Sequence, residues 1–237
     1  PCDLYIEGAD QYRGWFQSSL LTAVATRGSA PYKTCCSCGW VVDGEGRKMS
    51  KSLANGTAPE KIINQYGADI LRLWVASSDY HSDVRISFEY LKQLSEGYRK
   101  IRNTARYILG NISDFHPDTD SVPFDEMMEI DQWAVAMTEK LIADARKAYD
   151  AFDFHLVYHA IHNFCAADMS SFYLDVLKDR LYTEKSDGLK RRSAQTAIYT
   201  ILRSLTLLLA PILTFTSEEI WACLPDSKEN NKDSVML

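Results

Sequence analysis

The residues of this chain that are best suited to chemistry lie between Asp43 and Asn55, in a stretch that reads DGEGRKMSKSLAN. Its cations are Arg47, Lys48 and Lys51, and Lys51 stands between two serines, Ser50 and Ser52. Lysine is a mobile point charge that can follow a phosphate group as it moves, so this stretch could bind a triphosphate or a pyrophosphate. The two glycines ahead of the cations free the backbone to turn and to adopt positive φ. By composition alone a solvated surface loop is favoured, because most short basic clusters are only that.

Two other clusters contain residue types that bind metals, but neither has the pattern of a metal site. Three cysteines lie close together at positions 35, 36 and 38, without the second ligand pair that zinc motifs use. We interpret them as structural thiols in or beside a strand. Three histidines, at positions 155, 159 and 162, share one face of a predicted helix. We interpret them as a solvated stripe, and we expect no metal site in the chain.

The elements ahead of the basic stretch read as a strand, a helix and a strand. Residues 3–8 have strand alternation, residues 9–26 have helical apolar spacing, and residues 34–42 are rich in strand formers. This succession predicts a βαβ unit of a parallel sheet, in which ligands gather at the carboxyl ends of the strands. Residues 8–11 and 44–52 each follow a strand end, so we expect both segments to face one ligand.

Beyond the basic stretch the chain is predicted to be helical. Amphipathic periodicity indicates helices from Pro59, from Ser87, over 131–152, over 154–181 and over 193–210, and a capping-box spacing at 216–219 indicates a last short helix. Several such helices with short loops make a bundle. The fold class is therefore α/β followed by all-α. We expect a first domain over residues 1–90, a helical bundle over 91–225 and a polar, mobile tail over 226–237.

Composition narrows the class of protein further. The chain has 237 residues and a formal net charge of -6, which argues against a generally basic nucleic-acid binder but allows local basic stripes. The strongest such stripe consists of Arg99, Lys100, Arg102 and Arg106. Six irregularly spaced cysteines indicate a reducing compartment, hence a cytoplasmic location, and no apolar run is long enough for a membrane span. The abrupt opening PCDLYI reads like the interior of a larger protein, so we expect a fragment.

Several blocks of the sequence resemble one family. Lys48-Met49-Ser50-Lys51-Ser52 reproduces the KMSKS signature of class I aminoacyl-tRNA synthetases. The block IEGADQYRGWF at residues 6–16 resembles the EGSDQHRGWF block of the isoleucyl enzymes, and GADILRLW at 67–74 resembles their next segment. Residues 102–106 resemble a segment that the isoleucyl enzymes share with valyl enzymes. Residues 153–155, 171–175 and 210–213 resemble blocks of the anticodon-binding bundle of the isoleucyl enzymes. The resemblance covers nearly the whole chain.

This resemblance implies a fold, an activity and a set of site residues. The fold would be the C-terminal part of a Rossmann-like catalytic domain joined to an anticodon-binding helical bundle. The activity would be ATP-dependent ligation of isoleucine to tRNA(Ile) through isoleucyl-adenylate, with Mg²⁺, and the remainder of the synthetase chain would be a partner. Lys48 and Lys51 would be catalytic, and the ATP-binding loop would be Lys48, Met49, Ser50, Lys51 and Ser52. The substrate would meet Glu7, Gly8, Asp10, Gln11 and Trp15, and tRNA would meet Arg99, Lys100, Arg102 and Arg106.

The chain departs from the family pattern at two places. It has Cys38-Gly39-Trp40 where His-Gly-Phe is usual, and Tyr12 where histidine is common. The other class I signature, H-x-G-H, does not occur in the chain, so we expect that signature upstream and half an active site here. Two alternatives remain open: a fragment of a valyl-tRNA synthetase, and a non-catalytic tRNA-binding module derived from a synthetase.

Overall fold

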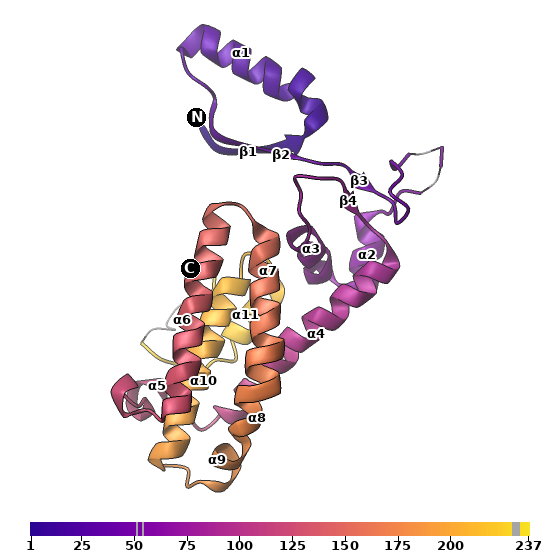
Figure 1. Ribbon diagram of the computed structural model, residues 1–237. Helices are drawn as coiled ribbons and strands as arrows, with labels where there is room; N and C mark the ends of the chain where they lie inside the picture. The colour runs from indigo at the N-terminus through magenta and orange to yellow at the C-terminus, as the bar shows by residue number, and fades with distance from the viewer. Residues whose placement is uncertain (51, 54, 229–232) are drawn as a thin grey trace. The chain divides into compact units, whose positions relative to one another are not determined.

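The computed structural model describes residues 1–50, 52–53, 55–228 and 233–237 (Figure 1). These residues form two compact units. One, here called the strand unit, consists of residues 1–58 and 78–90, and the other, the helical unit, consists of residues 59–77 and 91–237. The helices within 59–77 therefore pack with the bundle, whereas the sequence grouped them with the first domain. Within the described ranges, no helix has the length and apolar character needed to cross a membrane.

The strand unit begins with the predicted βαβ crossover. Strand β1 (Cys2–Gly8) leads through a 3₁₀ turn, η1 (Ala9–Arg13), into α1 (Trp15–Arg27) and then into β2 (Tyr32–Cys38). The two strands are parallel, with Cys2 opposite Tyr32 and Gly8 opposite Cys38. Helix α1 stops at Gly28, whose φ of 69° is left-handed. Glycine adopts this conformation without the steric cost of a Cβ, and it is the usual end of a helix. This confirms the predicted parallel unit.

The second predicted strand is broken into two at Gly39. After β2 the chain continues as β3 (Val41–Val42), which pairs in parallel with β4 (Val84–Arg85) in a separate small sheet. The amide of Gly39 donates to the carbonyl of Tyr80 at 2.8 Å. A Cβ at position 39 would lie 2.2 Å from the carbonyl oxygen of Ser82. Only glycine fits this close backbone approach, which ends one strand and starts the next.

The helical unit is a bundle with short connections. Its elements are α2 (Pro59–Tyr66), α3 (Ala68–Ser77), most of α4 (Phe88–Asn111), α5 (Pro117–Asp120), η2 (Phe124–Glu126), α6 (Glu129–Asp150), α7 (Phe154–Asn163), η3 (Phe164–Tyr173), α8 (Leu174–Val176), α9 (Lys178–Thr183), α10 (Leu189–Leu209) and α11 (Thr214–Trp221). Helices α6, α7 and α10 run alongside one another, with α11 against α10 (Figure 1). The predicted bundle is confirmed, and the fold class with it.

The core of the bundle follows the predicted apolar spacing. In α4 the side chains of Leu91, Ile101 and Ile108 are almost completely buried. The start of α4 is also as predicted, because the hydroxyl of Ser87 accepts a hydrogen bond from the amide of Tyr90 at 3.1 Å. Helix α10 is buried along most of its length. Burial of apolar side chains at helical spacing is what stabilises each of these helices.

Two predicted helices are interrupted. The helix expected from Pro59 is divided by Gly67, whose φ is 90°, into α2 and α3. The helix expected over 154–181 contains a π-helical segment, η3, where backbone hydrogen bonds span five residues. Apolar periodicity predicts helix in both cases, but it does not distinguish these local changes of winding.

The start of α11 differs from the predicted capping box. Thr216 lies inside the helix, and the capping acceptor is Asp69 of α3, which accepts from the amide and hydroxyl of Thr216 at 2.8 and 2.6 Å. Arg72, one turn further along α3, donates to the carbonyls of Pro211 and Ile212 at 2.7 and 2.9 Å. The carboxylate thus meets the positive end of α11, and the guanidinium meets the carbonyls that follow α10. Through these bonds α3 is fastened to the corner between α10 and α11.

A buried carboxylate, that of Asp131, joins α6 to three other elements: to α9 by an ion pair, and to η3 and α10 by hydrogen bonds. Asp131, with no exposed surface, accepts from Tyr173 at 2.8 Å and from Ser193 at 2.6 Å. Two nitrogens of Arg180 donate to the same carboxylate at 2.7 and 2.8 Å. Burial, followed by the charge of Asp131, raises the pKa of Tyr173 well above its usual range. Every oxygen of this carboxylate is therefore engaged.

The described residues of the C-terminal tail pack on the bundle. The hydroxyl of Ser227 lies 3.1 Å from that of Tyr199, and the amide of Val235 donates to Glu218 at 3.3 Å. Val235 itself is buried. The sequence predicts a polar, mobile tail, and its polar composition does not reveal that Val235 is buried.

Candidate functional site

The basic stretch of the strand unit leaves β3 through a tight turn. The amide of Gly46 donates to the carbonyl of Asp43 at 2.9 Å, and the amide of Asp43 donates to the carbonyl of Arg47 at 2.9 Å. Gly46 has a φ of 80°, as predicted for a turn glycine, whereas Gly44 does not have positive φ. A bridge between Val42 and Lys48 closes the turn. The chain therefore reverses at once and brings Lys48 back beside the end of β3.

Asp43 is the centre of this turn. Its buried carboxylate accepts from the backbone amides of Glu45 and Arg47 at 3.0 and 2.8 Å, and from the side chain of Arg47 at 2.9 Å. A fourth donor is the side-chain amide of Asn55 at 2.9 Å. The Asn55 bond, followed by the Arg47 amide, holds the pKa of the Asp43 carboxyl well below its usual range. Asp43 is therefore a permanent anion that organises the loop from its base.

The cations of the loop do not share one role. Arg47 is neutralised by Asp43 at 2.9 Å and by Glu45 at 3.1 Å. Lys48 is exposed, and its ammonium lies 4.6 Å from the centre of the Trp40 ring in a cation–π contact. Within the described part of the chain no carboxylate forms an ion pair with Lys48. Lys48 is thus the charge of this loop that is free to meet an anion, whereas Lys51 lies outside the described residues.

The remaining described residues of the signature keep the loop closed on itself. The amide of Ser50 donates to Asn55 at 3.0 Å, and the hydroxyls of Ser50 and Ser52 lie 3.1 Å apart. The Ser50 hydroxyl also accepts from the amide of Leu53 at 3.3 Å. Met49 is half-buried. These serines are engaged in internal bonds, so the charge in this part of the loop comes from the lysine.

The residues predicted to bind the substrate lie where β1 ends. Gly8 closes the strand, Asp10 and Gln11 lie on η1, and the Gln11 amide donates to Asp10 at 3.0 Å. The oxygen of Gln11 accepts from the backbone of Trp15 at 3.0 Å. A Cβ at Gly8 would lie 2.9 Å from the carboxylate of Asp10, so glycine makes room for this acid. The structure therefore brings three of the predicted residues together in one chain of hydrogen bonds.

Two aromatic rings support this end of the strand. The ring of Trp15 stacks on that of Tyr5 with centroids 4.2 Å apart, and 43% of Trp15 stays exposed. Glu7, the remaining predicted residue, is exposed on β1. One face of the Trp15 ring is thus used in packing, while part of its surface is available for a ligand.

The strand register relates the substrate-binding block to the loop. Gly8 is opposite Cys38, two residues before Trp40, and the Trp40 ring contacts Lys48. The substrate-binding block therefore follows the carboxyl end of β1, and Trp40, just past the carboxyl end of the neighbouring parallel strand β2, contacts the loop that leaves β3. That edge is where ligands bind in sheets of this kind.

The predicted basic patch lies on α4 in the helical unit. Arg99, Lys100, Arg102 and Arg106 are all exposed. Arg99 is paired with Glu96 at 2.6 Å, whereas the structure shows no ion pair for the other three within the residues it describes. Arg102 and Arg106 also line a hollow of about 200 Å³ between α4 and α11. These two arginines are therefore the members of the patch that line a hollow, which Glu219 also lines.

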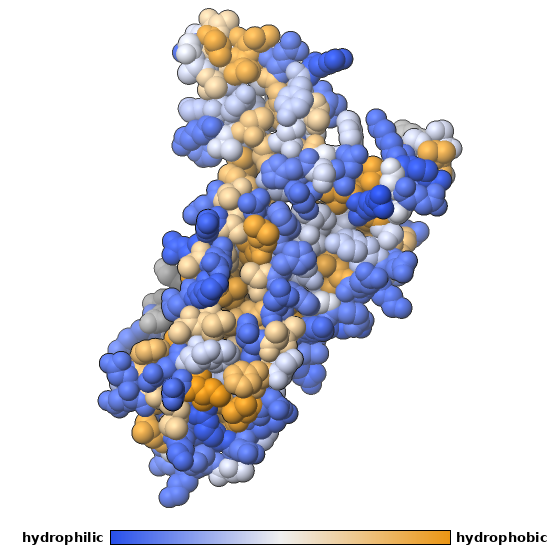
Figure 2. Space-filling view, viewed as in Figure 1, coloured by the Kyte–Doolittle hydropathy of each residue, from blue (hydrophilic) through white to orange (hydrophobic). Residues whose placement is uncertain are grey.

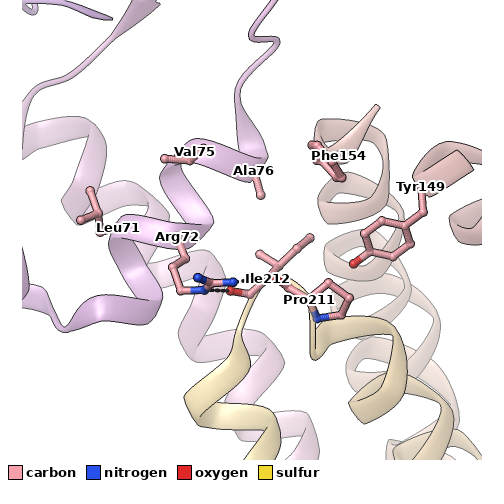
Figure 3. Close-up of a pocket in the computed structure, with 8 residues that line it drawn as sticks. All are labelled: Leu71, Arg72, Val75, Ala76, Tyr149, Phe154, Pro211 and Ile212. Atoms are coloured by element: carbon pink, nitrogen blue, oxygen red, sulfur yellow. Dashed lines mark hydrogen bonds between the residues drawn. The ribbon is translucent and has the colours of Figure 1, made fainter. Parts of the chain in front are cut away.

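A larger cavity, of about 400 Å³, lies between α3, the start of α7 and the corner after α10 (Figure 3). Its two polar side chains are already bonded, Arg72 to two carbonyls and Tyr149 to the carbonyl of Leu208 at 2.7 Å. The rest of its lining is apolar, and Ile212 lies between α3 and the side chains of Phe154 and Tyr149 in Figure 3. The guanidinium of Arg72 is thus already engaged, and this lining offers no free charge to a nucleotide.

The functional reading of the sequence missed Asp43 and Asn55. They are the first and last residues of the basic stretch, whose interpretation rests on its cations alone. An aspartate followed directly by glycine at the end of a strand is a turn signal, because its side chain can accept from amides further along the chain. No comparable signal marks Asn55, whose partners Asp43 and Lys48 lie twelve and seven residues earlier in the chain.

Two family models match this chain. Residues 1–87 match the class I tRNA synthetases for isoleucine, leucine, methionine and valine, and residues 131–237 match the anticodon-binding domain of tRNA ligases. Among curated proteins, the isoleucine–tRNA ligase of Natranaerobius thermophilus is 61% identical over 98% of this chain. That of Caldicellulosiruptor bescii is 60% identical over the whole chain. The chain spans about a quarter of the length of these relatives, 25% and 26% respectively.

Solved structures share the fold. A LeuRS–tRNA–LeuAMS ternary complex from Agrobacterium radiobacter matches 98% of this chain and 29% of its own, with a TM-score of 0.72 and 19% identity. A methionyl-tRNA synthetase of Mycobacterium tuberculosis bound by methionyl-adenylate matches 93% of this chain and 43% of its own, with a TM-score of 0.73 and 21% identity. At these identities the likeness concerns the fold alone.

Proposed function

This chain belongs to the isoleucine–tRNA ligase family of class I tRNA synthetases, and from that premise we propose that it serves in ATP-dependent ligation of isoleucine to tRNA(Ile). The observation that carries the proposal is that the Asp10–Gln11–Trp15 group follows the end of β1, while Trp40, just past the end of the parallel neighbour β2, contacts the free Lys48. The valyl alternative is not favoured, since the relatives compared above are isoleucine–tRNA ligases over the whole chain.

The proposed reaction begins with activation of the amino acid. The carboxylate of isoleucine attacks the α-phosphorus of ATP, the bond to the β-phosphate breaks, and pyrophosphate leaves with the negative charge. Lys48, together with Lys51, neutralises that charge as it develops. Glu7, Gly8, Asp10 and Gln11 hold the adenylate through carboxylate, amide and backbone contacts. Isoleucine then passes to the 3′ end of tRNA.

Mg²⁺ is proposed to arrive with the phosphates of ATP. Asp43 is the buried acid at the base of the signature loop, and both of its oxygens already accept hydrogen bonds from protein donors. This carboxylate is therefore unsuited to be a metal ligand, whereas phosphate oxygens suit Mg²⁺.

The remainder of the synthetase is the proposed partner of the strand unit. Ile6, Leu21 and Val24 expose about half or more of their surface, and Figure 2 shows hydrophobic residues gathered over α1. A helix with apolar residues on several sides is one that other protein covers. We propose that a segment bearing the second class I signature completes both the sheet and the ATP site.

Amino-acid activation by the full-length enzyme tests the proposal. We expect pyrophosphate exchange with isoleucine and far less with valine, and we expect Trp15→Ala to lower the isoleucine-to-valine ratio of kcat/KM, because it removes apolar wall. One methylene group in such a pocket is worth only about 1–3 kcal/mol, so discrimination has little margin. A matched control is Tyr12→Ala, which removes an exposed ring from the same block.

Three outcomes would count against parts of this assignment. Preferential exchange with valine would favour the valyl enzyme. An unchanged ratio in Trp15→Ala would remove Trp15 from the isoleucine pocket. If no amino acid supports pyrophosphate exchange, the non-catalytic tRNA-binding module would be favoured.

Binding of tRNA by the chain itself tests the basic patch. We expect weak binding that falls as salt rises, because phosphate neutralisation displaces counterions. Arg102→Ala or Arg106→Ala should each reduce the slope of log K against log salt by about 0.7–0.9, the change for one phosphate contact. Arg99→Ala should change it less, since Glu96 already pairs with Arg99.

The control for this titration is Lys140→Ala, which removes one exposed charge paired with Asp144 on α6. Filter binding or fluorescence anisotropy between 50 and 200 mM salt gives the slopes. Equal slopes for Arg102→Ala, Arg106→Ala and Lys140→Ala would mean that tRNA does not follow α4.

A further inference from the structure

In the described part of the loop, the side chain of Asn55 bonds both to Asp43, where the loop begins, and to the backbone of Lys48 and Ser50. Its nitrogen donates to the Asp43 carboxylate at 2.9 Å and to the carbonyl of Lys48 at 3.3 Å. Its oxygen accepts from the amide of Ser50 at 3.0 Å. One half-buried amide thus joins the end of β3 to the backbone on both sides of Met49.

Asp43 fixes the same limb from the other direction. It accepts from the amide and the guanidinium of Arg47, the residue immediately before Lys48. With the Asn55 bonds, the backbone is tied at Arg47, at Lys48 and at Ser50. The Cα of Lys48 is therefore held in place, while its side chain, lying on Trp40, stays free to move.

We propose that Asp43 and Asn55 are positioning residues, which act through Lys48 by holding the loop in the conformation that meets the phosphates of ATP. The inference rests on the proposed function of the loop. A charge contributes most to a transition state when it is placed beforehand, because no ordering then has to accompany the reaction. Without Asn55 the loop samples other conformations, and ATP binds with an affinity reduced by the fraction of time the loop is competent.

Pyrophosphate exchange by full-length variants measures this role. Asn55→Ala should lower kcat/KM for ATP about tenfold, through two or three lost hydrogen bonds, and leave the KM for isoleucine within twofold. The decisive measurement is a double-mutant cycle, in which Asn55→Ala should have less than a twofold effect in an enzyme that already carries Lys48→Ala. Asp43→Asn, which loses the charge but keeps the size, should behave in the same way. Glu45→Gln is the control, because it removes an exposed carboxylate of the same turn that does not contact Asn55.

A second readout needs no activity. Trypsin cuts after arginine and lysine, so a loosened loop should be cleaved at Arg47 or Lys48 at least fivefold faster in Asn55→Ala than in Glu45→Gln. The melting temperature of each variant shows whether the protein as a whole is still folded. Faster cleavage at an unchanged melting temperature is the expected result.

The outcomes separate this inference from the function on which it rests. If Lys48→Ala leaves exchange unchanged, the proposed role of Lys48 fails and the positioning role with it. If Lys48→Ala slows exchange but Asn55→Ala does not, the positioning role alone fails. The same holds if Asn55→Ala costs its full tenfold in the Lys48→Ala enzyme, since Asn55 would then act by another route.

Discussion

Replacing Lys48 with alanine in the full-length enzyme is expected to slow isoleucine-dependent pyrophosphate exchange by about 10²-fold or more. That is the scale of losing one donor that stabilises charge in a transition state. Arg47 cannot replace it, because Asp43 and Glu45 hold that guanidinium. The same loss is expected for Lys51→Ala.

Isoleucine binding without ATP should change little, which distinguishes loss of a phosphate contact from damage to the substrate site. A suitable control is Lys33→Ala, which removes an exposed lysine of the same unit, paired with Asp3 at 2.7 Å. Rates for Lys48→Ala within twofold of the wild type would contradict the assigned role.

The largest expected effect on stability comes from Asp131 in the bundle. Asp131→Ala leaves Arg180 with 15% of its side chain exposed and without its partner. Breaking a buried pair in this way costs about 3–5 kcal/mol, because an uncompensated charge stays behind. For a chain of this size each kcal/mol lowers Tm by about 2–4 °C, so Tm should fall by roughly 6–20 °C.

Thermal unfolding followed by circular dichroism measures this change. The matched control is Asp144→Ala on the same helix, whose carboxylate pairs with Lys140 at 2.6 Å but is 56% exposed. Exposed pairs contribute about 0–1 kcal/mol, so this variant should unfold close to the wild type. A similar small shift for Asp131→Ala would show that water or another acceptor compensates Arg180.

Features that depend on neighbouring residues could be predicted from the sequence. The βαβ crossover, the end of α1 at Gly28, the cap at Ser87 and the buried seam of α4 each follow from local spacing. In such cases the residues that form the feature lie within a few turns of one another. The sequence pattern therefore contains the whole interaction.

Features that depend on distant partners could not be predicted. The spacing at Thr216 is that of a capping box, but α11 begins two residues earlier, at Thr214. The carboxylate that accepts from the amide of Thr216 belongs to Asp69, nearly 150 residues earlier in the chain. The basic loop shows the same limit within thirteen residues. Its lysines are visible in the sequence, whereas the division between the paired Arg47 and the free Lys48 requires the fold.

The attachment of α3 to the α10–α11 corner has a consequence for sequence change. Asp69 and Arg72 bind mainly the main chain, through carbonyls at 211 and 212 and amides at 215 and 216. Any residue offers those carbonyls, and any residue except proline offers those amides. This contact therefore constrains Asp69 and Arg72 of α3 but leaves the side chains of the α10–α11 corner free to vary. A saturation library should tolerate many substitutions at Phe215 but should exclude proline there.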